Sequence, residues 1–334
     1  MKQNYLILYL VLLVLGCQST KRVPDVSNIS IQLQTERFEK DLFAIDTFGI
    51  DASLQQLNKK YPGFTHDFIF NILGISPETV EKDLPKFIST YQSMQQKSQY
   101  IFKNFTKIEE QIKNGLQFVH YYFPAYKLPT KLITFIGPIN SYGNIITPNA
   151  LAVGLQLYMG NDYPMYLSEM GQQLYPLFIS RRFEPAYIPV NCIKNIVDDI
   201  YPNKNEGKSL VEQMVEAGKR IYLLDLLMPN APDSIKTGYS QKQLDECFAS
   251  EKSIWSYFIQ NDLLFSKDPN LVRDYLTDGP NTPALGDASP GNIGQFVGKQ
   301  IVNKWMQKNK SISPEILMNT PAKQIFDEAK YKPK

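Results

Sequence analysis

Histidine is scarce in this sequence, and its scarcity excludes a large class of enzymes. The 334 residues contain only His66 and His120, far apart in the chain. A zinc protease of the H-E-x-x-H type needs two imidazoles one helical turn apart, with a Glu between them as general base. The sequence also lacks a G-x-S-x-G elbow, a Walker A loop and a G-x-G-x-x-G fingerprint. We therefore predict no catalytic residue, no metal site and no cofactor.

An excess of charge of either sign is missing as well. The 35 Lys and Arg residues stand against 33 Asp and Glu residues, and the formal net charge is +2. A general nucleic-acid binder needs a basic field that attracts phosphates, so nucleic acid is not expected as a partner. Hydrophobic content of 43% and charged content of 20% are typical of a folded globular protein.

Cysteine is also rare, with three residues in the whole chain. Cys192 and Cys247 both lie in apolar, helical patterns, which favours two buried free thiols. A disulfide between them stays open as an alternative, because an oxidising compartment would allow one and the sequence does not give their separation.

The third cysteine, Cys17, ends a short apolar run at the N-terminus. Tyr5 to Leu15 is unbroken in its apolar character but too short to span a bilayer, as expected of a secretory signal. The ending Val14-Leu15-Gly16-Cys17 resembles the bacterial lipobox. The resemblance implies that residues 1–16 are a signal peptide and that the Cys17 thiol is acylated, with palmitate for example, and anchored in the lipid bilayer. The alternative is an ordinary signal peptide with an accidental cysteine.

Residues 17–34 are predicted to form a lipidated tether. They are polar, include Pro24 and show no hydrophobic period, so they can let the folded body stand off the membrane. Gln18 rather than Asp follows the cysteine. By analogy with other bacterial lipoproteins, this favours the outer membrane, with the protein facing the periplasm.

Residues 35–334 are predicted to form a single globular domain of mainly helical α+β class. Short β-branched and aromatic runs separated by Gly, Pro and Asn predict a small β-sheet at about residues 130–158. Most other segments show helical periodicity, and three helix starts carry capping signals. These signals are Ser76-Pro77-Glu78, Ser209 with Glu212, and Ser240 with Gln243.

A helix that follows the loop at residues 278–291 contains three regularly spaced glycines. Gly291, Gly294 and Gly298 alternate with apolar residues. Because glycine has no side chain, this spacing lets a neighbouring backbone approach closely. We expect close helix packing rather than a ligand site at this helix.

Five charged residues are candidates for a binding groove. Arg181 and Arg182 could bind a carboxylate or phosphate group, although paired arginines at a helix end more often cap carbonyls or contact acids. Glu184, Glu216 and Asp225 are the carboxylates considered for acid–base chemistry. Such chemistry needs a pocket that brings acids together and raises the pKa of one of them. Converging acids would favour an enzyme, and scattered acids would favour a binding protein.

Several motifs together give a family resemblance that covers nearly the whole chain after the signal peptide. The sequence is similar to the GldB gliding-motility lipoproteins of Bacteroidetes. This resemblance implies a cell-envelope lipoprotein required for gliding, a movement linked to type IX secretion. The segments that carry it are Val14 to Cys17, Glu36 to Phe43, Tyr121 to Pro124, Gly154 to Gly160, Arg181-Arg182, Ile254 to Ile259, Asp278 to Pro280, Ser289 to Gly294 and Lys330 to Pro333.

A more distant resemblance is to predicted proteases of the zincin type. The order of strands, the run from Gly154 to Tyr158 and the helix with Glu216-Ala217-Gly218 are similar, but the helical region around Arg181 to Ile188 has no histidine. The fold is therefore expected to be a degenerate zincin-like scaffold that has kept a groove for binding. We expect a non-catalytic protein that binds components of the gliding and secretion machinery. The alternative is a periplasmic hydrolase acting on peptide or cell-wall material.

Overall fold

A four-stranded mixed sheet lies in the N-terminal half of the protein. The computed structural model describes residues 23–147 and 149–333. The strand order is β1-β2-β4-β3. β1 and β4 each pair with β2 in parallel, and β3 pairs with β4 antiparallel at the edge of the sheet. The strands are β1 (Gln34–Arg37), β2 (Lys131–Phe135), β3 (Asn144–Ile146) and β4 (Ala150–Gly154).

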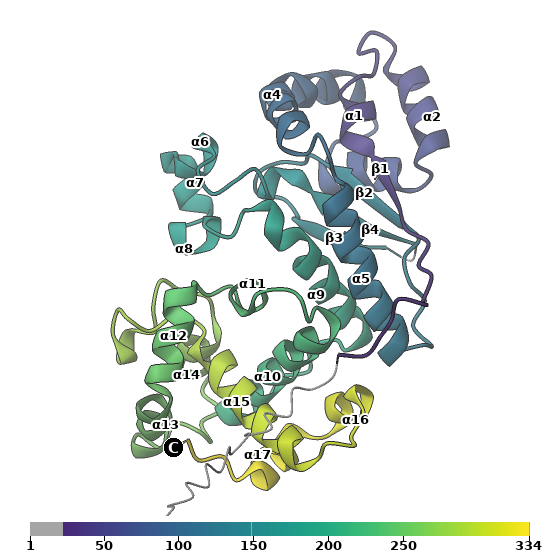
Figure 1. Cartoon of the computed structure of the whole chain (residues 1–334). Coiled ribbons are helices and arrows are strands. Elements are labelled where there is room, and N and C mark those ends of the chain that lie inside the picture. The colour runs from purple at the N-terminus through teal and green to yellow at the C-terminus, as the bar shows by residue number, and fades with distance from the viewer. Residues whose placement is uncertain (1–22, 148, 334) are drawn as a thin grey trace, which may run out of the picture.

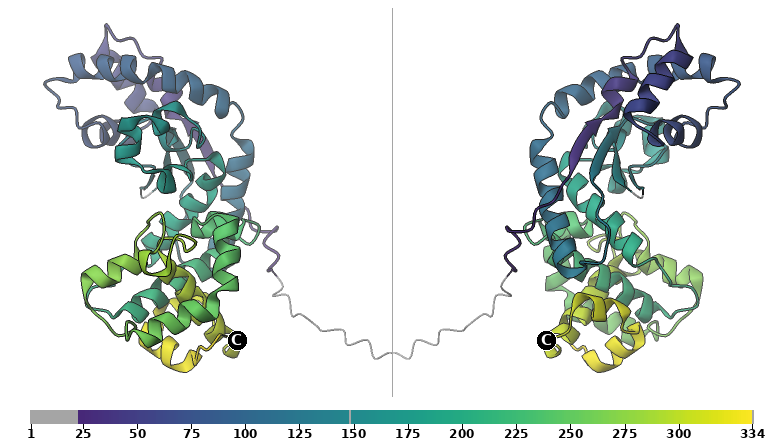
Figure 2. Two further views of the ribbon diagram at one scale, coloured as in Figure 1. Left: turned by 90° about the vertical axis from the view of Figure 1, so that its left-hand side faces the viewer. Right: turned by 90° about the vertical axis from the view of Figure 1, so that its right-hand side faces the viewer.

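Helices cover both faces of this sheet, because successive side chains of a strand point to opposite sides. Along β4, Leu151 and Val153 belong to one apolar cluster, and Ala150 and Ala152 belong to another. All four side chains are buried. The sheet is therefore the middle layer of three, as Figures 1 and 2 show.

The first covering layer is formed by the chain between β1 and the end of α4. Phe38 is fully buried at its centre, and its ring lies 5.0 to 5.1 Å from the rings of Tyr61, Phe64 and Phe68. Edge-to-face aromatic contacts of this kind stabilise the layer beyond the area that they bury. The elements of this layer are α1 (Phe38–Leu42), α2 (Ile50–Lys60), α3 (Phe64–His66), the π-helix η1 (Asp67–Ile72) and α4 (Val80–Ile101).

The opposite face is covered by α5 (Thr106–Tyr122) and α9 (Ile188–Ile200). The segment at residues 23–33 also packs on this side: Val26 and Leu33 are buried, and Gln117 Nε2 on α5 donates to Ile29 O at 2.9 Å. The predicted tether at residues 17–34 thus includes eleven residues that lie against the folded body. Its first part, with Cys17, lies outside the described residues.

Short helices occupy the stretch between the sheet and α9. Pro176 and Pro185 interrupt this stretch, and a new short element starts at each of them. The sheet predicted at about residues 130–158 ends earlier than expected, because the chain turns into a 3₁₀ helix after Gly154. The elements are η2 (Leu155–Leu157), α6 (Pro164–Leu167), α7 (Glu169–Leu174), α8 (Leu177–Ser180) and η3 (Pro185–Tyr187).

The C-terminal half is helical and has its own apolar cluster. Both predicted capping boxes are confirmed: Ser209 with Glu212 starts α10, and Ser240 with Gln243 starts α12. The start predicted at Ser76 is early, because residues 76–79 form a turn before α4. The helices are α10 (Leu210–Leu227), α11 (Asp233–Thr237), α12 (Gln241–Ala249), α13 (Glu251–Gln260), α14 (Pro269–Leu276), η4 (Pro283–Leu285), α15 (Ile293–Lys308), α16 (Pro314–Asn319) and α17 (Ala322–Ala329).

Two glycines allow α10 and α15 to touch backbone to backbone. A Cβ on Gly298 would lie 1.6 Å from Met214 O, and one on Gly218 would lie 2.1 Å from the carbonyl carbon of Gly298. No side chain fits in so small a space. The prediction of close packing at the α15 glycines is confirmed, and we call this contact the α10–α15 seam.

The structure confirms a mainly helical α+β fold with a small sheet, but the sheet begins earlier in the chain than the sequence predicted. β1 lies at residues 34–37, at the boundary where the tether was expected to pass into a helix. Within the described part of the chain, no helix is both long and apolar enough to cross a bilayer.

Candidate functional site

The two predicted groove arginines serve structural contacts at the end of α8. The Arg181 guanidinium donates to Gly238 O at 2.8 Å and to Gln243 Oε1 at 3.2 Å. Arg182 forms an ion pair with Asp278 at 2.7 Å. These contacts join α8 to the loops around α12 and α14, as the structural interpretation of the pair predicted.

The three predicted carboxylates do not converge. Glu184 accepts a hydrogen bond from the backbone of Asn161 at 2.9 Å. Glu216 lies between Lys208 and Lys219, at 2.9 and 3.3 Å. Asp225 forms ion pairs with Lys236 and Lys299. None of the three acids lines the same cavity as another. The three acids are therefore scattered, and each has partners of its own.

Histidine and cysteine also have no shared site. His66 and His120 are both exposed, on α3 and α5. Cys192 and Cys247 are both buried and free, as the sequence favoured, and burial raises the pKa of each thiol to about 12. Among the described residues, no cluster of three or more His, Cys, Asp or Glu side chains is arranged to hold a metal ion.

A polar stripe on α9 instead marks the most developed site. Asn191, Lys194, Asn195 and Asp198 follow one face of a helix whose other residues are mostly buried and apolar. This face lines two adjacent cavities of about 720 and 400 Å³, which share Lys194 and Asp198. The sequence predictions missed this site, although the i, i+3, i+4, i+7 spacing of polar residues in an apolar helix was a signal that could have indicated it.

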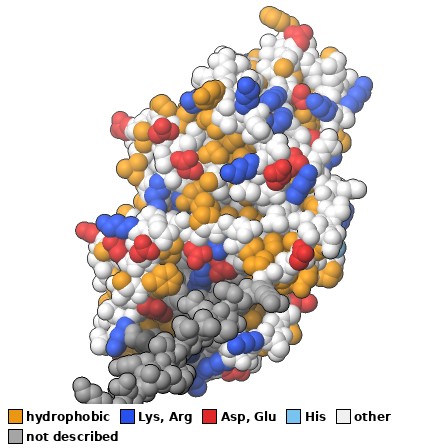
Figure 3. Space-filling model, viewed as in Figure 1, with side chains coloured by type: hydrophobic (Ala, Val, Ile, Leu, Met, Phe, Trp, Pro, Cys, Tyr) orange, Lys and Arg blue, Asp and Glu red, His pale blue; other side chains and the backbone are white. Residues whose placement is uncertain are grey.

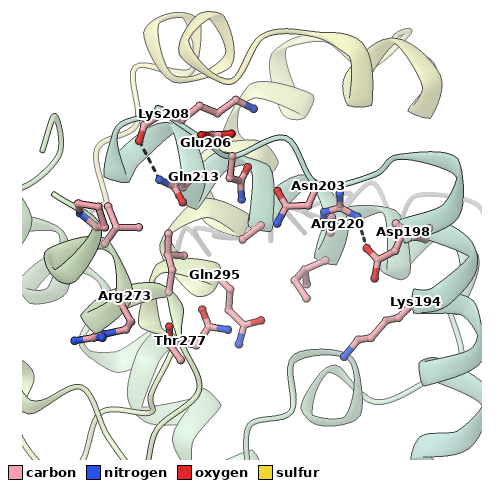
Figure 4. Close-up of a pocket in the computed structure, with 18 of the residues that line it drawn as sticks. Lys194, Asp198, Asn203, Glu206, Lys208, Gln213, Arg220, Arg273, Thr277 and Gln295 are labelled. Carbon is pink, nitrogen blue, oxygen red and sulfur yellow. Dashed lines mark hydrogen bonds and ion pairs between the residues drawn. The ribbon is translucent and has the colours of Figure 1, made fainter. Parts of the chain in front are cut away.

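The larger cavity is formed by α9, α10, α14, the start of α15 and the loop at residues 203–208. We call it the α9 cavity. Its lining contains five basic and two acidic side chains. Figure 4 shows Lys194 extending from α9 into the open part of the cavity, whereas Arg220 is turned toward Asp198. The charged lining residues are Lys194, Asp198, Glu206, Lys208, Arg220, Lys267 and Arg273.

Lys194 differs from Arg220 and Lys208 because, among the described residues, its Nζ has no hydrogen-bond or ion-pair partner. Arg220 pairs with Asp198 and donates to Tyr201 O, and Lys208 pairs with Glu216. Lys194 is half-buried, and removal of its amine from water lowers the pKa of Lys194 to about 8. The cavity therefore holds one desolvated cation that the protein leaves unpaired.

A second unusual surface lies on α6, α7 and α8. Five large apolar side chains are exposed there, and Figure 3 shows hydrophobic atoms at the corresponding left-hand edge of the molecule. Residues 163–180 carry one charged side chain, Glu169. We call this patch the α6–α8 surface. Its exposed members are Met165 (39%), Leu167 (51%), Met170 (69%), Leu174 (41%) and Leu177 (61%).

The described residues thus form a mainly helical α+β fold with scattered acids, a basic cavity and an exposed apolar patch. The family model of the gliding motility protein GldB matches residues 19–333. The chain therefore belongs to the GldB family of gliding-motility lipoproteins, which places it in the cell envelope with a role in gliding. Searches of curated proteins and of solved structures gave no match.

Proposed function

We propose that this GldB-family lipoprotein is a non-catalytic component of the gliding and type IX secretion machinery, which holds a partner protein of the envelope on its α6–α8 surface. It is anchored through acylated Cys17, in the outer membrane facing the periplasm. The observation that carries the proposal is the concentration of five exposed apolar side chains on three consecutive short helices.

An exposed patch of this kind costs solvation free energy unless another surface covers it. A protein partner suits the α6–α8 surface better than an anionic membrane, because residues 163–180 contain no Lys or Arg to attract lipid headgroups. The surface also lies away from residues 23–33, the described segment nearest to Cys17, which run along α5 on the other side of the molecule. A partner could therefore dock while the anchor is in the bilayer.

A hydrolase acting on peptide or cell-wall material would need an acid whose pKa is raised beside a second acid. Glu216 has instead two lysine partners, and Asp225 has two others. We infer that these ion pairs give Glu216 and Asp225 a structural rather than a catalytic role.

The proposal is tested by replacing Met170 and Leu177 with Ser in the same chain. Both side chains are more than half exposed, so the double variant should fold and reach the envelope normally. We expect loss of gliding at unchanged protein level. The matched control carries Phe48→Ser and Ile259→Ser, which remove exposed apolar side chains elsewhere. Normal gliding of the Met170 and Leu177 variant, or equal loss in the control, would contradict the proposal.

The anchoring part is tested separately. A Cys17→Ala chain should be released from the membrane fraction and should not support gliding. Normal gliding of cells that carry Cys17→Ala would contradict the proposed anchor. It would not bear on the α6–α8 surface, which the Met170 and Leu177 variant tests.

A further inference from the structure

The α9 cavity has the size and polarity of a small-molecule site, and the proposed docking role does not use it. Its volume of about 720 Å³ falls within the range of ligand pockets, roughly 300 to 1,000 Å³. Apolar residues such as Val197, Ile221 and Leu224 line it together with the polar groups. Most of the lining residues are polar or charged, so the cavity suits a polar ligand better than an apolar one.

The charge of the lining indicates the class of ligand. Asp198 is engaged by Arg220, and the other acid, Glu206, is exposed. Lys267 and Arg273 are exposed lining residues, and neither forms an ion pair within the described part of the chain. Asp198, Asp278 and Arg182 also act electrostatically on Lys194, but the lining still carries more positive than negative charge, which attracts anions into the cavity.

A second group in the lining also lacks a partner. Asn292 precedes α15 with a left-handed backbone (φ 57°), and its buried side-chain Oδ1 accepts no hydrogen bond among the described residues. A buried acceptor without a donor costs about 1 to 3 kcal/mol. Lys194 Nζ therefore lacks an acceptor, and Asn292 Oδ1 lacks a donor. One anion that also carries a hydrogen-bond donor can supply both.

We propose that the α9 cavity binds a small oxyanion, a phosphate or carboxylate group on a molecule that also carries hydrogen-bond donors. The Lys194 ammonium group pairs with the oxyanion. Asn292 Oδ1 accepts an N–H or O–H of the same molecule, and Lys267 and Arg273 attract the ligand electrostatically. Lys208 and Arg220 keep their existing partners and shape the wall.

Three probes test the site by titration calorimetry on the full chain in detergent and low-salt buffer: inorganic phosphate, glycerol 3-phosphate and diglycine. We expect millimolar binding of inorganic phosphate and tighter binding of one of the two larger probes, which tells a phosphate ligand from a carboxylate ligand. Lys194→Gln should weaken binding at least tenfold, while Lys194→Arg should retain most of it. The matched control, Lys252→Gln, removes an exposed lysine that does not line the cavity and should bind like the wild type.

The pH dependence gives a readout that a structural role would not produce. Because the pKa of Lys194 is lowered to about 8, its amine loses the proton as the pH rises from 7 to 9. Phosphate becomes more negative over the same interval, which by itself would strengthen its binding to a cation. Weaker phosphate binding at pH 9 would therefore show that the charge of Lys194 is needed for binding. No binding of any probe at millimolar concentration would overturn the proposal. Equal weakening by Lys194→Gln and Lys252→Gln would also overturn it, since it would reveal attraction by the overall charge alone.

Discussion

The α10–α15 seam and the α9 cavity both involve α10 and α15, but their lysines differ in their contacts. In and around the seam, Lys219 donates to Glu216 and to the carbonyls of Met318 and Thr320, at 2.6 to 3.3 Å. Lys194, in the cavity, has no partner within the described residues. The comparison separates a cation that stabilises the fold from one that is available to a ligand.

Two further buried lysines near the seam, Lys236 on α11 and Lys299 on α15, also have carboxylate partners. Lys236 and Lys299 are 5% and 10% exposed, and both contact Asp225 and Asp233 at 2.6 to 3.5 Å. The nearby carboxylates hold the pKa of Lys236 above its ordinary value despite burial, whereas burial without a pair lowers the pKa of Lys194. Burial also lowers the pKa of Lys219 although Glu216 is its partner, so the contacts of a lysine, and not the direction of its pKa shift, distinguish the two roles.

The largest effect is expected from adding a side chain inside the seam. Gly298→Ala places a methyl group 1.6 Å from Met214 O, so the two helices must separate. We expect a loss of about 3 kcal/mol or more in the free energy of unfolding, measured by urea denaturation. In Gly49→Ala the new Cβ meets its nearest atom at 3.5 Å, so this control should lose less than about 1 kcal/mol. Equal stability of the two variants would show that the seam is loosely packed.

A smaller loss is expected when Lys236 and Lys299 lose a shared partner. Asp225→Ala leaves Lys236 and Lys299 with Asp233 as their remaining carboxylate. We expect the free energy of unfolding to fall by about 2 to 4 kcal/mol, because a buried charge then lacks full compensation. Asp245→Ala, which removes an exposed acid, should change it by no more than about 0.5 kcal/mol. An unchanged Asp225→Ala protein would mean that these ion pairs contribute nothing to stability.

The smallest effect has the opposite sign and concerns the cavity lysine. Lys194→Met removes a desolvated, unpaired charge, so without anions it should stabilise the protein by about 1 to 2 kcal/mol at pH 7. The folded-state pKa of about 8 lies below the ordinary lysine pKa of 10.5. The unfolded chain thus binds more protons between these pH values, and wild-type stability rises there with pH. The gain from Lys194→Met should therefore shrink as the pH rises from 8 to 10.5, measured by thermal unfolding. If Lys194→Met instead lowers the free energy of unfolding, Lys194 stabilises the fold and is not an unpaired cation kept for a ligand.

The features that the sequence predicted well are those determined by nearby residues. The capping boxes at Ser209 and Ser240 need only residues within one turn, and both form as predicted. The strands at 131–154 were recognisable because apolar runs alternate with turn residues.

The features that the sequence missed depend on partners far along the chain. β1 consists of Gln34-Thr35-Glu36-Arg37, which has no apolar signal, and it becomes a strand by pairing with β2. The candidate groove was placed on acids whose lysine partners could not be known from sequence. Lys194 stands out only once α10, α14 and α15 are packed around α9 and leave its amine unpaired.

The most direct test of the proposed function is site-specific photo-crosslinking in living, gliding cells. A photoreactive residue replaces Met170 in one strain and Phe48 in another, since both side chains are highly exposed and apolar. Crosslinked species are then identified by mass spectrometry. We predict a discrete adduct with an envelope protein of the gliding or secretion machinery from position 170 and none from position 48. Adducts with lipid or a second copy of this chain at position 170, or the same adducts at both positions, would contradict the proposed function.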